Sequence, residues 1–395
     1  MRSSEWISGQ YDSGKTMQNR PIKEIMKIVP VTNKTELKKF IRLPYKLYKN
    51  DPVWVPPLLT EVSKQFDRKR NPTLDHCEYA FFLLEKEHEI IGRIAAFTDI
   101  IALQEWNDPV GLFGYFECID DKDAATLLFN AAADWLRSKG MKYMRGPWSF
   151  ISQEWGLVIE GFTPSPTVMA PYNPSYYVNH ITEYGFEKIK DLLVYYISGT
   201  EGYHIPDRIL TLTDDVAKRY NIRTRQLNMR DYDNEVSRVI ELSNKSLVDN
   251  WGYTQVTREE AEAIGADLKS IIHPRCVVFA EDSNGGAVGF AIAIPDVNSL
   301  IKNLKGRLLP LGWLKVMLGL PRLRNYRLFA LGVLPEYHLK GIDSLIYRAL
   351  YEGLYTQDIW LEINYVLEDN APMNNAIVKL GAKPLRRYRI YQKSI

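Results

Sequence analysis

Residues 9–16 read GQYDSGKT and fit the phosphate-loop pattern G-x-x-x-x-G-K-[ST] at every position. Such a loop binds phosphates only when it follows a buried strand and opens a helix. The preceding residues, MRSSEWIS, are too few and too polar for a buried strand, and Pro21 would break a helix that began at the loop. We therefore expect residues 1–22 to form a disordered or extended tail, not a nucleotide site.

A second phosphate-binding candidate lies between an apolar strand, RLFALGV, and a helical stretch, LIYRALYEGL. The connecting loop, residues 335–344, reads PEYHLKGIDS and contains Lys340 and Gly341. A tight strand-to-helix loop directs unpaired backbone N–H groups toward one point, and this arrangement suits a diphosphate. The alternative interpretation is an ordinary connecting loop that happens to contain a glycine.

Three glutamates are candidates for acid–base chemistry. Glu362 interrupts the apolar strand IWLEINYVL, where a charged residue either faces solvent or serves a function. Glu154 lies in the aromatic-rich segment WSFISQEWG, from which it could face a cleft. Glu368 directly precedes Asp369 and Asn370, two residues that could cap the following helix.

Aromatic residues are the candidates for an acceptor pocket. The segment PYNPSYY places Tyr172, Asn173 and Tyr176 at the start of a helix, and Trp251 follows a helix in the second half of the chain. Such side chains offer an apolar body and a polar tip. Packing against the sister domain is the alternative role for the tyrosines.

The composition narrows the class of protein. The chain has 395 residues, 46% of them hydrophobic and 25% charged, which indicates two globular domains or one large one. A net charge of +2 gives no reason to expect nucleic-acid binding. Three cysteines and six histidines show no metal-ligand spacing, so no metal is expected. No apolar run of 18 residues and no signal-peptide core occur, so a cytoplasmic location is expected.

The two halves of the chain resemble each other at a nearly constant offset. Trp54 and Trp251 are 197 residues apart, and so are Gly92 and Gly289. The stretches YNPSYYVNHITEYGFEK and DNAPMNNAIVKLGAKP keep the same spacing to within a residue. Several matches in one order predict a duplicated unit.

Each copy is expected to run strand, helix, hairpin, strand, helix, strand, helix, strand. This order predicts an α/β protein of two tandem domains, each a mixed, mostly antiparallel sheet flanked by helices. We expect the first domain at 23–200, a linker at 201–220 that begins with Gly and Pro residues, and the second domain at 221–395.

The stretch LGVLPEYHLKGIDSLIYRAL resembles motif A of the GCN5-related N-acetyltransferase (GNAT) superfamily. That motif is a strand, then V-x-P-x-[YF]-[RQ]-x-x-G-x-[GA], then a helix. Val333, Pro335, Tyr337 and Gly341 match it, and Asn370 followed by the triplet LGA resembles motif B of the same superfamily. The order of elements in both halves is similar to the superfamily as well, so the resemblance covers about residues 26–197 and 220–395.

The resemblance implies acyl-CoA or acetyl-CoA as the donor and an amine as the acceptor. In this superfamily the pantetheine arm of CoA pairs with the split end of the fourth strand, and the pyrophosphate binds the N–H groups of the following loop. Carried over to this chain, the implied donor contacts are Leu331, Gly332, Val333, His338, Leu339, Lys340, Gly341, Ile342, Ser344 and Asn370.

Four positions depart from the family pattern. His338 stands where Arg or Gln is usual, and Leu339 stands where Gly is common. Asp343 replaces a small residue and brings a negative charge to the phosphate end of the helix, which is unfavourable there unless it points outward. Ile377 occupies the position of the tyrosine that often protonates the leaving thiolate, so the acid–base roles must fall to other residues.

The first copy lacks an equivalent loop. Its corresponding stretch, FGYFECIDDKDAATLLFNAA, contains Asp120, Asp121 and Asp123 and no glycine among them. These carboxylates would repel a diphosphate, so we expect only the second copy to bind CoA. The first copy is then a structural or acceptor-side partner.

Residues 298–327 form an insert that the first copy lacks. They contain seven Lys or Arg residues and no Asp or Glu, among Leu, Trp, Met and Val. This composition is typical of an amphipathic segment on an anionic membrane, here the inner face, or of a lipid-site lining. Two short helices that cover the edge of the sheet are the alternative.

A lipid-associated insert favours a long-chain amine as the acceptor, and the overall pattern is somewhat similar to bacterial ceramide synthases. A Fem-type aminoacyl transferase, which uses aminoacyl-tRNA, is one alternative, although the net charge of +2 does not favour a tRNA partner. A non-catalytic acyl-CoA-binding protein is another, because Asp343 and Ile377 depart from the family pattern.

Overall fold

The computed structural model describes residues 26–151 and 154–395. The segment 9–16 and the tail expected at 1–22 lie outside the described residues. The strands are β1 (Met26–Pro30), β2 (Cys77–Lys86), β3 (Glu89–Asp99), β4 (Val110–Cys118), β5 (Tyr143–Gly146), β6 (Leu157–Glu160), β7 (Glu187–Ser198), β8 (Arg223–Gln226), β9 (Val277–Glu281), β10 (Ala287–Pro295), β11 (Asn325–Val333), β12 (Trp360–Leu367) and β13 (Lys383–Ser394).

The α-helices are α1 (Lys34–Leu47), α2 (Leu59–Gln65), α3 (Ile100–Trp106), α4 (Lys122–Ser138), α5 (Tyr176–Glu183), α6 (Asp207–Tyr220), α7 (Tyr232–Ser246), α8 (Arg258–Leu268), α9 (Asn298–Ile301), α10 (Gly312–Gly319), α11 (Ile342–Leu354) and α12 (Ala371–Lys379). Short 3-10 turns connect several of them, notably η1 (Pro72–Asp75) and η7 (Pro335–Tyr337). The predicted α/β class is confirmed, because helices flank a mixed sheet.

All strands of the described chain belong to one sheet, in the order β1-β2-β3-β4-β5-β13-β7-β12-β11-β10-β9-β8, with β6 paired to β13. The order is the same when it is followed inward from either edge: β1 to β5 from one side and β8 to β12 from the other. This symmetry supports the internal repeat inferred from the sequence. The halves share one sheet, so their division into two domains stays a prediction.

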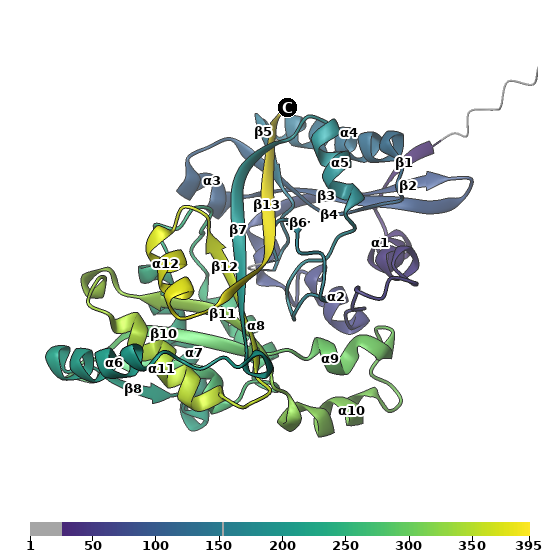
Figure 1. The fold of residues 1–395 in the computed structure, drawn as a ribbon. Helices are drawn as coiled ribbons and strands as arrows, with labels where there is room; N and C mark the ends of the chain where they lie inside the picture. Colours follow the sequence, from purple (N-terminus) through teal and green to yellow (C-terminus); the bar gives the residue numbers. More distant parts are fainter. Residues whose placement is uncertain (1–25, 152–153) are drawn as a thin grey trace, which may run out of the picture.

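The final strand of each half crosses to the other half. β13, from the second half, lies beside β5, and β7, from the first half, lies beside β12. The two crossing strands pair with each other antiparallel along most of their length, and Figure 1 shows them side by side between the upper and lower parts of the molecule. Each half therefore depends on a strand that the other half supplies.

Four apolar clusters cover the two faces of the sheet. In the first half, Leu128 of α4 is buried on one face and Phe40 of α1 on the other. In the second half, Ile346 of α11 and Leu242 of α7 occupy the corresponding places. Their helices place apolar residues three or four positions apart, so one stripe of each faces the sheet.

The segment predicted as a linker, 201–220, is largely a helix, α6, which carries Thr213 and Val216 in buried positions. Arg348 of α11 donates hydrogen bonds to Leu210 O and Thr213 Oγ1 of α6, at 3.1 and 2.8 Å. Residues 209–220, ILTLTDDVAKRY, place apolar residues at helical spacing, and this spacing creates the buried stripe of α6. The linker prediction is wrong for these residues because it does not take this helical spacing into account.

The insert, residues 298–327, forms α9, α10 and two 3-10 turns before β11 begins. One of its seven basic residues, Arg327, lies inside β11 and is fully buried. Arg327 therefore does not contribute to the basic surface predicted for the insert, which consists of the other six Lys and Arg residues at most.

The exchange of strands predicts that neither half folds alone. We expect fragments 26–202 and 203–395, expressed separately, to show no cooperative unfolding by circular dichroism, because each lacks a central strand of its sheet. Co-expression should give a one-to-one complex by size-exclusion chromatography. A chain truncated after Leu380, which lacks β13, should also show no cooperative unfolding by circular dichroism. A first fragment that unfolds cooperatively as a monomer would show that β13 is dispensable.

Candidate active site

The site begins where β11 and β12 separate. The two strands pair in parallel from Asn325 to Leu328 on β11 and from Trp360 to Ile363 on β12. Beyond these residues the strands diverge, and the register between β10 and β11 shifts at Ile292 and Ala293. The backbone of β11 after Leu328 is left unpaired on its β12 side, which is the split end implied by the family resemblance.

A cavity of about 1460 Å³ opens from this split and extends between the two halves. Ligand pockets for small molecules usually measure about 300–1,000 Å³, so this cavity is large enough for a long substrate or for two substrates together. Side chains of the first half, such as Trp148 and Phe150, and side chains of the second half, such as Trp251 and Phe329, line it. Both copies therefore contribute to one site.

The residues implied as donor contacts divide into two groups. The cavity is lined by Leu331, Gly332, Val333, His338, Leu339, Gly341 and Asn370. Lys340, Ile342 and Ser344 do not line it. Ile342 is buried in the apolar core, Ser344 Oγ donates to Gly341 O at 2.6 Å, and the Lys340 ammonium lies over the rings of Tyr220 and Tyr337.

The loop before α11 leaves the N-terminus of this helix open. Gly341 is the N-cap residue with φ of 78°, a left-handed conformation that glycine adopts without steric cost, and no side chain caps the helix from this position. His338 Nε2 lies 2.8 Å from Val333 O, so the loop is tied to the end of β11. An uncapped helix N-terminus beside a split strand can accept an anionic group.

Asp343 lies in the first turn of α11 and lines the same cavity. Burial raises the pKa of its carboxyl group, while hydrogen bonds from the backbone N–H groups of Ser344 and Asp343 oppose the rise. The carboxyl group thus occupies backbone N–H donors that a diphosphate would need. The outward orientation considered for Asp343 does not occur.

The equivalent position in the first half is closed. Asp121 caps α4, because its side chain accepts from Ala124 N at 3.0 Å. The backbone N–H at the end of β4, on Cys118, donates to Tyr177 Oη at 2.7 Å, and Tyr176 Oη donates to Cys118 O at 2.8 Å. Side chains of α5 thus satisfy groups that a donor would otherwise contact.

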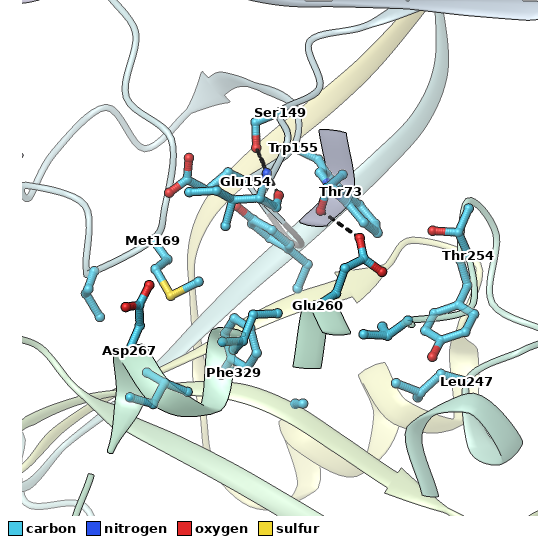
Figure 2. Close-up of a pocket in the computed structure, with 18 of the residues that line it drawn as sticks. Thr73, Ser149, Glu154, Trp155, Met169, Leu247, Thr254, Glu260, Asp267 and Phe329 are labelled. Atoms are coloured by element: carbon cyan, nitrogen blue, oxygen red, sulfur yellow. Dashed lines mark hydrogen bonds between the residues drawn. The ribbon is translucent and has the colours of Figure 1, made fainter. Parts of the chain in front are cut away.

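Glu154 lines the cavity, as expected for a cleft-facing residue. Burial raises the pKa of its carboxyl group to about 7, and the charge of Arg327 opposes this rise only in part. A carboxyl group with a pKa near neutrality can take up and release a proton at physiological pH. Figure 2 shows Glu154 in the upper part of the view and Phe329 of β11 below it, with Glu260 between them at the right; all three line the cavity.

The other two predicted acid–base residues lie elsewhere. Glu362 is buried at the paired end of β12, opposite Arg327 in register, and its Oε2 accepts from Thr167 Oγ1 at 3.1 Å. Glu368 accepts from Lys188 Nζ at 2.6 Å and from Asp191 N at 2.9 Å. Neither glutamate lines the cavity. The pairing of β12 with its neighbours directs both side chains toward these hydrogen-bond partners instead.

The predicted acceptor residues divide in the same way. Trp251 lines the cavity, whereas Tyr172, Asn173 and Tyr176 do not. Tyr172 donates to Asp51, and Asn173 is buried, where its Oδ1 accepts from Val158 N at 2.7 Å. Tyr176 donates to Cys118 O, so all three residues form hydrogen bonds within the first half, and these bonds do not involve the sister domain.

A charged cluster of His76, Asp99 and Glu260 on the cavity wall was not predicted from the sequence. His76 Nδ1 lies 2.9 Å from Asp99 Oδ1, and His76 Nε2 lies 3.1 Å from Glu260 Oε1. Burial lowers the pKa of His76, but the hydrogen bonds to Asp99, Cys77 and Glu260 raise it to about 12, so the ring is an imidazolium. The three residues come from distant parts of the chain, so no local spacing could reveal them.

His76, Cys77 and Asp99 also form a group whose ligand atoms lie within 4.8 Å of one another. Both ring nitrogens of His76 already contact carboxylates. The cluster is therefore explained as an ion pair that joins α8 of the second half to the first half. Thr73 completes it by donating to Glu260 Oε1 at 2.6 Å (Figure 2).

Three buried polar atoms on the cavity lining have no hydrogen-bond partner in the described part of the chain: Tyr365 Oη, Trp155 Nε1 and Ser246 Oγ. Buried polar groups are normally satisfied, so such atoms indicate contacts with a ligand or with water. Tyr365 lies on β12 beyond the split, and Ser246 lies against Gly332, where a Cβ atom would come within 2.1 Å of Ser246 Oγ. Two of the three unpaired atoms, Tyr365 Oη and Ser246 Oγ, thus lie beside the split strands.

No family model matches the chain. The chain is 34% identical to Protein YghO of Escherichia coli over 92% of its own length and 94% of that protein. It is 32% identical to a protein named bacterial ceramide synthase from Caulobacter vibrioides over 94% of its own length and 98% of that protein.

Solved structures show the same fold at low sequence identity. A tandem GNAT protein from the clavulanic acid biosynthesis pathway aligns over 94% of this chain and 98% of its own, with a TM-score of 0.56 and 12% identity. The chain therefore has a GNAT acyltransferase fold and belongs to the same family as Protein YghO and bacterial ceramide synthase.

Proposed function

We propose that the protein transfers an acyl group from acyl-CoA to the amine of a long-chain lipid. The observation that carries the proposal is a cavity that joins the split strands of the second half to an apolar wall of the first half. One relative is named a bacterial ceramide synthase, a name that agrees with an amide-forming reaction on a lipid amine. The volume of about 1460 Å³ leaves room for an acyl chain beside the donor.

In the proposed reaction the amine nitrogen attacks the thioester carbonyl, a C–N bond forms and the C–S bond breaks. Glu154 accepts the proton that the amine loses, because its raised pKa makes it a base near neutral pH. The leaving thiolate must gain a proton. Tyr365 is the proposed donor of that proton, because its buried hydroxyl group has no partner in the described residues and lies on the split strand.

Ile377 cannot serve as the acid, because it is an alkyl side chain buried in the core of the second half. The proposed acid, Tyr365, therefore lies on β12 and not on α12, because Tyr365 lines the cavity and Ile377 does not. We propose that the acyl-CoA site lies only in the second half, since Asp121 and the α5 tyrosines close the equivalent place in the first.

We propose domain limits at 23–200 and 221–395, with α6 of the intervening segment packed against α11 of the second domain. A non-catalytic acyl-CoA-binding protein is the second candidate function, and it is favoured by Ile377, a core alkyl side chain at the position of the tyrosine acid of the superfamily. A reaction between a water-soluble donor and a lipid acceptor would place the protein in the cytoplasm, at the inner face of the membrane. No helix of the described residues is long and apolar enough to cross a bilayer.

The donor site can be tested at Gly341. Gly341→Asp should weaken CoA binding by at least about tenfold, because the added carboxylate at the helix N-terminus would repel the pyrophosphate of CoA. Isothermal titration calorimetry with CoA measures this effect. Gly140→Asp is the matched control, since Gly140 has φ of 79° against 78° at Gly341 but has no atoms within 4 Å of an added Cβ and lies away from the cavity. Unchanged CoA affinity in Gly341→Asp would place the donor elsewhere.

The proposed base can be tested at Glu154. Glu154→Gln should lower kcat by roughly 10²–10⁴-fold while donor binding stays unchanged, because the amide cannot accept the proton. The wild-type rate should fall as pH decreases through about 7, since the carboxylate becomes protonated, and the variant should lose this step. Glu368→Gln, at a residue outside the cavity, should retain the wild-type rate and profile. A Glu154→Gln enzyme with wild-type kinetics would exclude this role.

A further inference from the structure

The insert exposes an apolar surface that the fold leaves uncovered. Five large hydrophobic residues lie exposed within ten positions, and they define the apolar face of the insert: Leu309 (77% exposed), Leu311 (69%), Trp313 (49%), Met317 (54%) and Leu318 (59%). Single exposed hydrophobic residues are ordinary, but a group of this kind marks an interaction site. Figure 1 shows α10 at the lower edge of the molecule, below α9 and away from the central sheet.

Positive charges surround this face. Lys305, Arg307, Lys315 and Arg322 are exposed, and none of them forms an ion pair among residues 26–151 and 154–395. No Asp or Glu occurs between residues 298 and 327. A patch that combines exposed apolar side chains with uncompensated cations is complementary to the surface of an anionic bilayer.

The opposite face of the insert forms part of the cavity wall. Ile301, Leu308 and Val316 line the cavity. Contacts with the first half hold this wall in place: Leu59 N donates to Gly306 O at 2.9 Å, and Lys302 Nζ donates to Ser165 Oγ at 2.9 Å. The same short segment thus separates the cavity from the exposed apolar face.

We infer that the insert docks on an anionic phospholipid bilayer and that a single-chain lipid passes across it from the bilayer into the cavity. The docking rests on the exposed residues and their charge. The passage of a lipid rests in addition on the proposed function, since it assumes a lipid acceptor. α10 is too short to span a bilayer, so the docking is reversible and interfacial.

Vesicle flotation tests the docking without any enzymatic step. The wild-type protein should float with vesicles that contain about one third phosphatidylglycerol and should bind much less to pure phosphatidylcholine. Binding should weaken between about 0.1 M and 0.5 M salt, because the salt screens the cations. Trp313→Ser/Leu318→Ser and Lys305→Glu/Arg307→Glu should each reduce binding by roughly tenfold or more.

Matched controls exist on the rest of the surface. Leu212→Ser/Val378→Ser removes hydrophobic residues of similar exposure, 47% and 57%, from other helices. Lys38→Glu/Lys39→Glu reverses two exposed charges on α1. Both controls should bind vesicles like the wild type. If the wild type fails to bind anionic vesicles, or if Trp313→Ser/Leu318→Ser merely converts a dimer to a monomer in analytical ultracentrifugation, the proposed docking is overturned.

Activity assays separate docking from the reaction. With a long-chain amine presented in vesicles, the insert variants should lose about as much activity as they lose binding. With a short-chain amine in solution, they should keep the wild-type rate. Vesicle binding by a protein that acylates no amine would overturn the proposed function and leave the docking intact. Equal loss on both substrates would overturn the passage of the lipid across the insert.

Discussion

The exchange of β7 and β13 is the constraint on which the rest of the structure depends. Asp191 of β7 is fully buried and binds Arg389 of β13 through two hydrogen bonds of 2.7 and 2.9 Å. Burial raises the pKa of Asp191, but Arg389 and Lys188 outweigh this effect and lower it, so the carboxylate stays charged. A buried pair of this kind favours one register of the two strands, because any shift would leave a charge unpaired. With that register, the two halves enclose a common cavity.

The two halves have diverged at the position where a GNAT fold would hold its donor. In the second half, Gly341 leaves the start of α11 uncapped and β11 separates from β12. In the first half, Asp121 caps α4, and tyrosines of α5 bind the end of β4. The same topology thus supports an open site in one copy and a filled core in the other. The filled copy supplies Glu154 and aromatic walls to the shared cavity.

Electrostatics gives the cavity two different kinds of acidic group. Asp99 and Glu260 both contact His76 and so join the halves. Burial raises the pKa of Glu260, but the hydrogen bonds to His76 and Thr73 outweigh this effect and lower it, so Glu260 is unsuited to accept a proton. Glu154 forms no ion pair with a histidine among residues 26–151 and 154–395, and burial raises its pKa to about 7. The contrast resembles other sites in which the environment separates the roles of neighbouring carboxyl groups. It also explains why Glu154 is the better candidate for proton transfer.

The sequence by itself determined the α/β class, the repeat, the strand-to-helix loop at Gly341 and the unusual composition of the insert. These features depend on local periodicity, on glycine and on charge, which act over a few residues. The sequence offers Glu154, Glu362 and Glu368 as candidates, and only the fold places Glu154 on the cavity lining and the other two outside it. The charge cluster of His76 and the exchanged strands were not predictable from local patterns. They depend on pairing between residues far apart in the chain, and that pairing is decided only when the whole sheet forms.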